Sequence, residues 1–230
     1  MRTKALVLTA ALTAAGLLNS LAAVYSVNVV GYVNVTAKAG FNLMACPLKA
    51  TPNTVADIVK LPAAIEDAQL FKWNGSGYDV ASYFGAGAWL YSTATDMTLA
   101  PGDGFFLFLP TGTADATITF VGEVTQGADS NMSIDGEAAG KFSLVGSKVP
   151  QSLDLNAMAF PASVEDEAVY FWRRTTTSPN GGYVIYTYFG EGAWLGSDAS
   201  QPELPTPLVG EGFFVFKKAA GTWTRDFVVQ

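Results

Sequence analysis

Two repeated pairs of adjacent carboxylates are the residues of this chain best suited to catalysis. Glu66-Asp67 and Glu165-Asp166 stand in matching sequence contexts, and hydrolysis of a glycosidic bond needs only two carboxylates. Adjacent residues of a strand point to opposite faces, however, so neither pair would converge on one substrate. The chain has no histidine, which excludes serine–histidine and cysteine–histidine nucleophile pairs, histidine general bases and most zinc sites. The sequence therefore favours a non-catalytic protein over a glycoside hydrolase, with both pairs in turns before strands.

A single acidic residue between two glycines precedes the apolar strand of each copy, at Asp103 and at Glu211. Flanking glycines suit a tight turn that needs positive φ. Catalysis by these acids is the alternative, and the turn is favoured.

A third group of oxygen-bearing side chains alternates between Asp129 and Glu137, loosely like a calcium loop. That loop needs glycine at its sixth position, where this chain has Ile134. A solvated connector is therefore favoured over a calcium site, and we expect no metal and no cofactor.

Repeated aromatic residues are the candidates for ligand binding. Aromatic faces can stack on sugar rings, whereas the alternative is burial, because large aromatic side chains dominate the core of small domains. Burial is favoured for the tryptophans, and tyrosines that face away from the apolar strand face are the better surface candidates. The candidate ligand-binding residues are Tyr78, Tyr83, Trp89, Tyr183, Tyr188 and Trp194.

The only cysteine, Cys46, lies in an apolar segment, so no intramolecular disulfide can form. An intermolecular link or a nucleophile is the alternative to a small buried hydrophobe, which is the favoured interpretation.

The segments that would position these residues occur twice in the sequence. Residues 77–90 recur at 182–195 with nine of fourteen positions identical. Other matched segments, first copy against second, are 41–43 and 142–144, 62–67 and 161–166, and 102–108 and 210–216. A conserved order over this length predicts tandem duplication of one fold unit.

Each copy is rich in aromatic and β-branched residues at alternating positions, as in 80–84 and 184–188, which predicts strands. The apolar run 105–109 predicts a strand covered on both faces. One short helix is expected near 51–59, with a weaker counterpart at 152–158. The predicted fold is all-β, with two tandem, similar sandwich-like or barrel-like modules packed side by side through their duplicated aromatic faces, each with at most one short helix.

Residues 1–22 have the pattern of an export signal. Arg2 and Lys4 precede an apolar stretch, 5–18, and a small-residue cleavage site at 20–22. The stretch is shorter than the roughly 20 residues of a membrane span, so cleavage is favoured over anchoring. We expect a protein without a membrane span that is secreted, on the cell surface or periplasmic.

The chain is acidic, with 13 Lys and Arg against 20 Asp and Glu and a net charge of -7. Loss of the signal would remove two positive charges. An acidic surface repels phosphate backbones and anionic membranes, so nucleic acid is not an expected partner.

The segment 25–36 has a strand pattern, and similar patterns follow at 120–124 and 227–229. These strands either complete the sheet of each module, which is favoured, or the N-terminal strand adds to the exposed edge of a neighbouring molecule. The partners considered are therefore a second copy, bound through the N-terminal strand, and an extracellular polysaccharide.

The motifs of the first copy resemble a module of uncharacterised exported bacterial proteins. They are Gly40-Phe41-Asn42-Leu43, Pro47-Leu48, Trp73, Trp89 and Pro101-Gly102-Asp103-Gly104-Phe105-Phe106, with Asn28-Val29-Val30-Gly31-Tyr32-Val33 before them. The second copy departs from the pattern at Lys141 and Val209. The resemblance implies export and a repeated β-module, and it implies no activity.

The sequence thus predicts four segments: a signal peptide at 1–22, an N-terminal strand with module 1 at 23–126, a connector at 127–140 and module 2 at 141–230. The leading function is a non-catalytic structural or surface-assembly role outside the cytoplasm. The alternative is a pair of carbohydrate-binding modules, and hydrolysis by a carboxylate pair is a distant third.

Overall fold

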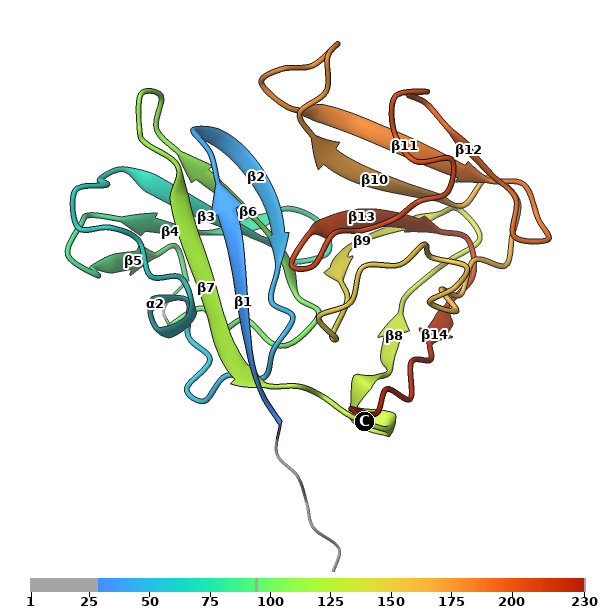
Figure 1. Cartoon of the computed structure of the whole chain (residues 1–230), viewed down its shortest axis with the longest axis horizontal. Coiled ribbons are helices and arrows are strands. Elements are labelled where there is room, and N and C mark those ends of the chain that lie inside the picture. Colours follow the sequence, from blue (N-terminus) through green and yellow to red (C-terminus); the bar gives the residue numbers. More distant parts are fainter. Residues whose placement is uncertain (1–28, 94, 230) are drawn as a thin grey trace, which may run out of the picture.

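The computed structural model describes residues 29–93 and 95–229, and the expected signal at 1–22 lies outside them. Two five-stranded antiparallel sheets dominate (Figure 1). The first has the order β2-β6-β3-β4-β5, with strands β2 (Gly40–Ala45), β3 (Ala68–Trp73), β4 (Tyr78–Tyr83), β5 (Trp89–Tyr91) and β6 (Gly104–Leu109). The second has the order β9-β13-β10-β11-β12, with strands β9 (Lys141–Gly146), β10 (Ala168–Arg173), β11 (Gly182–Tyr188), β12 (Trp194–Gly196) and β13 (Gly212–Lys217). The all-β prediction is confirmed.

Each module also has a two-stranded sheet that joins its first strand to its last. β1 (Val30–Ala37) pairs with β7 (Ala116–Glu123), and β8 (Met132–Ile134) pairs with β14 (Gly221–Trp223). Both copies therefore have the same strand order, and the prediction of two similar tandem modules is confirmed.

One short helix, α2 (Val55–Ile58), follows β2. Thr54 caps it, because its side chain accepts a hydrogen bond from the backbone N–H of Asp57. Val55 and Ile58 are buried, so the predicted helix is confirmed. Its expected counterpart at 152–158 is a turn at 155–159 instead.

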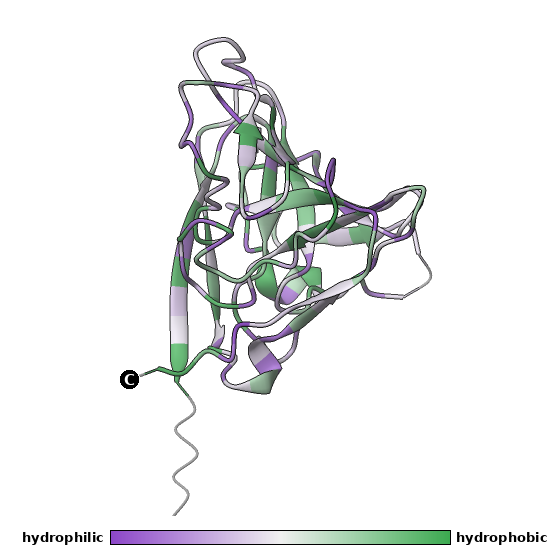
Figure 2. Ribbon diagram, turned by 90° about the vertical axis from the view of Figure 1, so that its right-hand side faces the viewer, coloured by the Kyte–Doolittle hydropathy of each residue, from purple (hydrophilic) through white to green (hydrophobic). Residues whose placement is uncertain are grey.

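The core of each module is built by side chains from both of its sheets. Strand residues of alternating direction supply them, and apolar residues follow the strands whereas hydrophilic ones gather in the loops (Figure 2). The first core includes Leu70, Phe105, Leu107, Ile118 and Phe120. The second core includes Val169, Phe171, Tyr186, Phe213 and Trp223.

Cys46 belongs to the first core and is 1% exposed. Its Sγ donates to the carbonyl oxygen of Leu48 at 3.1 Å, and burial raises the pKa of the thiol to about 11. The interpretation of this residue as a small buried hydrophobe is confirmed.

A third apolar cluster joins the modules and lies on the outer faces of the two large sheets. Its members are Leu43, Phe71, Trp73, Phe106, Leu144, Tyr170, Trp172 and Phe214. The indole Nε1 of Trp73 donates to the carbonyl oxygen of Phe142 at 3.3 Å, and that of Trp172 donates to Phe41 at 3.1 Å. Matched residues thus bond across the junction in both directions, and the expected packing through duplicated aromatic faces is confirmed.

The backbone repeats this reciprocity. The N–H of Ala45 donates to the carbonyl oxygen of Gly210 at 2.9 Å, and the N–H of Gly146 donates to that of Gly102 at 2.9 Å. Ala45 matches Gly146, and Gly102 matches Gly210, so each copy makes the same bond to the other. The junction is therefore isologous, as in a two-fold dimer, although both halves belong to one chain.

We expect Gly212→Ala to destabilise this junction. A Cβ at Gly212 would lie 2.4 Å from the carbonyl oxygen of Met44 in the other module, and overpacking of this kind costs about 1–3 kcal/mol. Urea unfolding measures the loss. Gly77→Ala is the matched control, since a Cβ there meets no atom within 4 Å. Equal midpoints for the two variants would contradict the close approach.

Candidate functional site

The repeated carboxylate pairs lie in turns. Asp67 and Asp166 have positive φ values, 59° and 64°, and their N–H groups donate to the last residues of β4 and β11, Tyr83 and Tyr188, at 2.9 Å each. The turn interpretation of these pairs is confirmed.

The two acids between glycines also build turns. Asp103 and Glu211 each accept the backbone N–H of the residue three positions earlier, at 2.9 and 2.8 Å. Each also pairs with a cation of its own sheet, Asp103 with Lys72 and Glu211 with Arg173, at 2.7 Å in both cases. Gly102 and Gly210 have positive φ there, which confirms the predicted tight turns.

The segment 127–140, expected to be a solvated connector rather than a calcium site, belongs to the second module. It contains the 3₁₀ helix η2 (Ala128–Ser130) and β8. Asn131 accepts the N–H groups of two C-terminal residues, and Asp135 pairs with Lys141 at 2.8 Å. Across residues 29–93 and 95–229, no group of three His, Cys, Asp or Glu side chains could hold a metal ion.

Three of the six candidate aromatic residues are buried, which corrects their assignment to a binding surface. Tyr83, Tyr188 and Trp194 are 1%, 8% and 9% exposed, so their ring faces touch core residues. The Tyr83 hydroxyl donates to a backbone carbonyl and accepts the N–H of Gly87 at 2.9 Å. Trp89 is half-buried, with its ring centroid 5.0 Å from that of Tyr83. Tyr83 thereby fixes the glycine-rich turn at residues 84–88.

Tyr78 and Tyr183 are the candidates that remain at the surface, 40% and 45% exposed. Their rings contact Trp73 and Trp172 at 5.2 and 5.1 Å between centroids, so both lie beside the inter-module cluster. Burial, with a smaller effect of Tyr78, raises the pKa of Tyr183 to about 12. The structure therefore brings these two candidates together and separates them from the other four.

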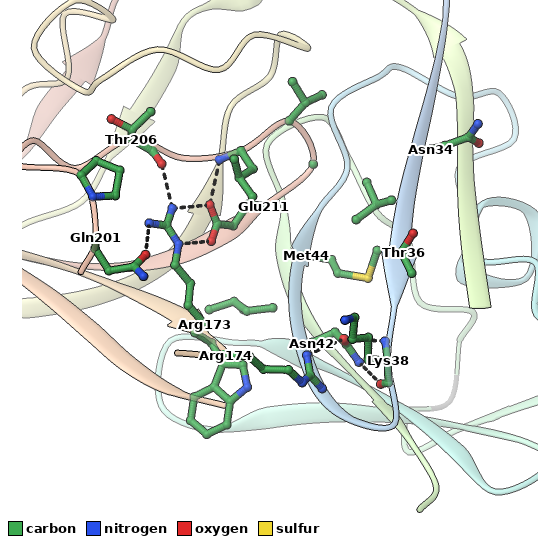
Figure 3. A pocket seen from close by; sticks show the side chains of 17 residues that line it. Asn34, Thr36, Lys38, Asn42, Met44, Arg173, Arg174, Gln201, Thr206 and Glu211 are labelled. Atoms are coloured by element: carbon green, nitrogen blue, oxygen red, sulfur yellow. Dashed lines mark hydrogen bonds and ion pairs between the residues drawn. The ribbon is translucent and has the colours of Figure 1, made fainter. Parts of the chain in front are cut away.

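A cleft of about 650 Å³ opens between the modules (Figure 3). β1, β2 and the turn between them supply one wall, with Asn34, Lys38 and Asn42. The end of β10 and the loop before β13 supply the other, with Arg174 and Gln201. None of these residues is among the ligand-binding candidates predicted from the sequence. The available signal was Arg173-Arg174, the only adjacent arginines in an acidic chain.

An ion pair stiffens the second wall of the cleft. Arg173 donates from Nε and Nη2 to the two carboxylate oxygens of Glu211, each at 2.7 Å. The guanidinium carbon lies 4.3 Å from the ring centroid of Phe171, and another Arg173 nitrogen donates to the Gln201 side-chain oxygen at 3.2 Å. The charge of Glu211 is thereby compensated, and both of its carboxylate oxygens already accept hydrogen bonds.

The N-terminal strand pairs within its own chain and leaves one edge open. The N–H of Val124 donates to the carbonyl oxygen of Val29 at 2.8 Å, and the register continues from that pair along β1. Hydrogen-bonded pairs alternate in an antiparallel ladder, so the odd-numbered residues of β1 bond to β7. The even-numbered residues from Val30 to Thr36 direct their N–H and C=O groups away, and these groups find no partner among the described residues.

Sequence reasoning also missed a buried ion pair in module 2. Lys217 Nζ lies 2.5 Å from Glu167 Oε2, and both side chains are 1% exposed. Burial opposes ionisation of Glu167, but the hydrogen bond and charge of Lys217 and several backbone N–H groups outweigh it, so the pKa of this carboxyl is lowered. The matching positions of module 1 hold Ala68 and Leu109, both buried.

Comparisons of the chain with protein-family models, with curated protein sequences and with solved structures gave no match. Within the described residues, no helix has the length and apolar character needed to cross a membrane.

The buried pair should tolerate joint replacement but not the loss of one partner. Glu167→Ala strands the Lys217 charge in the core, and we expect a loss of about 3–5 kcal/mol of unfolding free energy. The double variant Glu167→Ala/Lys217→Leu restores the residues of module 1 and should regain most of that loss in urea unfolding. A double variant no more stable than the single one would contradict this account.

The same pair should make the wild type sensitive to acid. The pKa of Glu167 is lower in the folded than in the unfolded chain. The ionised carboxylate therefore contributes fully to the unfolding free energy above the ordinary carboxyl pKa, and this contribution is lost as pH falls through the lowered pKa. Between about pH 7 and about pH 3, wild-type unfolding free energy should fall more than that of the double variant. Parallel pH profiles would rule the linkage out.

Proposed function

We propose that this protein is a non-catalytic assembly protein that acts outside the cytoplasm and joins a second copy of itself through the open edge of β1. The observation that carries the proposal is the edge, whose outward-directed backbone groups have no partner among the described residues. Val30 and Tyr32 on this edge are 69% and 67% exposed. The signal pattern at 1–22 supports export.

The composition of β1 makes the edge suitable for pairing. Proteins usually protect an edge strand with charge, proline, a bulge or short length. β1 has eight residues, and none is charged or a proline. An uncharged, regular edge of this length is a template for another strand.

The other sheet edges in the described chain are shorter or covered. β5 and β12 have three residues each, and β2 and β9 lie against the opposite module. On the outer edge of β7, the N–H and C=O of Glu123 pair with Lys49 at 2.9 Å each, and the α2 segment with Asp57 and Lys60 lies beside Thr119 to Val121. β1 is therefore the edge on which we place assembly.

A second copy suits this edge because antiparallel pairing about Val33 is self-complementary. Tyr32 would lie opposite Asn34 of the other copy, and Val30 opposite Thr36. No like charges face one another, and β-branched and aromatic cross-strand pairs stabilise sheets by about 0.2–1 kcal/mol each. The product is an isologous four-stranded sheet made from two two-stranded ones.

Lysines at the exposed half of the edge should abolish assembly. Lysine on an edge strand is one of the devices by which proteins block edge pairing, and the Tyr32→Lys charges of two copies would become diagonal neighbours on the shared sheet face. In Val30→Lys/Tyr32→Lys, sedimentation of the purified mature protein should therefore change from dimer to monomer. Deletion of the strand is unsuitable, because Val33 and Val35 pack against the core.

The matched control is Thr117→Lys/Val121→Lys, which adds the same charge to exposed positions of β7. This control should remain dimeric. A wild type that is monomeric at every concentration, or an edge variant that still dimerises, would overturn the proposal.

A further inference from the structure

The inter-module cleft gathers positive charge that the protein does not neutralise. The chain carries a net charge of -7, and the described ion pairs use five other basic residues. Lys38 and Arg174 both line the cleft, and neither pairs with a described carboxylate. Two uncompensated cations in one cleft of an acidic protein indicate a site for an anion.

Arg174 is fixed in place by neutral oxygens. It donates to the carbonyl oxygen of Ala39 at 2.8 Å, to that of Phe41 at 3.4 Å and to Asn42 Oδ1 at 3.3 Å. These bonds hold the guanidinium across the module junction without cancelling its charge. A guanidinium has five N–H donors, so two remain for a ligand.

Asn42 links the opposite wall of the cleft to Arg174 by hydrogen bonds. It is 7% exposed, its Oδ1 accepts the N–H of Lys38 at 2.8 Å, and its Nδ2 donates to the carbonyl oxygens of Lys38 and Leu107 at 2.7 and 3.1 Å. One buried amide therefore contacts both the backbone that carries Lys38 and the Arg174 side chain.

This arrangement occurs in only one of the two copies. The residue that matches Asn42 is Ser143, and the residue that matches Arg174 is Gly75. The duplicated module folds without these side chains in its other copy, so they are not needed to build the module.

Two amide side chains of the cleft present donors rather than acceptors. Asn34 Oδ1 already accepts from Thr119 at 2.7 Å, and Gln201 Oε1 accepts from Arg173 at 3.2 Å, so their amide N–H groups are available. Glu211, the one carboxylate in the lining, is paired. A ligand rich in acceptors and negatively charged complements this lining.

We propose that the cleft binds a carboxylate-bearing saccharide, with Arg174 and Lys38 on a uronate carboxylate and the amides of Asn34 and Gln201 on ring or hydroxyl oxygens. The volume lies within the range of small-molecule sites, roughly 300–1,000 Å³. An acidic peptide is the competing ligand class, because the open backbone groups of Asn34 and Thr36 also line the cleft and could pair with a peptide strand. The fixed side-chain donors favour the saccharide.

Titration calorimetry with trigalacturonate tests the site. Wild-type protein should bind, binding should weaken as salt is added, and Arg174→Gln should bind about 10–100-fold more weakly, as expected for hydrogen bonds to a charged group. Lys38→Gln should also weaken binding and cannot disturb the junction through its side chain, which makes no described hydrogen bond. Lys60→Gln, two residues beyond the end of α2, is the matched control and should bind as wild type.

Two further probes identify the ligand class. Fully methyl-esterified trigalacturonate should bind at least about tenfold more weakly, since it lacks the charge, and tri-aspartate should bind more weakly than trigalacturonate. Equal binding of the ester, tighter binding of the peptide, no binding by the wild type, or unchanged affinity in both Arg174→Gln and Lys38→Gln would overturn the proposal. Asn34 and Thr36 belong to both the cleft lining and the edge proposed for assembly. Val30→Lys/Tyr32→Lys keeps all cleft residues, so it should bind trigalacturonate at least as tightly as wild type even though it does not assemble.

Discussion

The contact between the outer faces of the two large sheets is the constraint on which the rest of the structure depends. β6 and β13 are apolar on both faces, and the small β1–β7 and β8–β14 sheets can cover only one face each. The second face of each large sheet is buried in part by the other module, through Phe106 and Phe214. Each copy therefore needs a partner of its own kind, and tandem duplication supplies that partner in the same chain.

This near-symmetry separates the residues that build the module from those that do something else. Trp73 and Trp172 make the same bond in opposite directions, and a repeated role of this kind marks a residue of the scaffold. Arg174 and Asn42 have Gly75 and Ser143 as counterparts, so the duplicated architecture does not require them. The cleft combines these unmatched polar residues with matched ones such as Leu43 and Trp172, so its polar groups, unlike the repeated aromatics, are not explained by the scaffold.

The class of fold, the duplication and the turns could be predicted from the sequence, because they depend on local patterns such as alternating residues and flanking glycines. The sequence did not separate Tyr78 from Tyr83 as surface candidates. Their spacing places them on opposite faces of β4, but only the packing of the other sheet decides which face is exposed. Lys38 and Arg174 come from different modules and line one cleft, and Glu167 and Lys217 pair although they are 50 residues apart. Contacts between residues so distant in sequence leave no local pattern.

An acidic protein that binds an acidic saccharide is physically consistent, because the two charges act over different ranges. At physiological ionic strength the screening length is about 8 Å, so most carboxylates of the chain act weakly on a ligand inside the cleft. The nearest one, Glu211, is neutralised by Arg173. Inside the cleft the fixed donors and the two cations dominate, whereas outside it the net negative charge opposes non-specific binding of polyanions. The acidity that argues against nucleic acid as a partner therefore sharpens the selectivity of this one cleft.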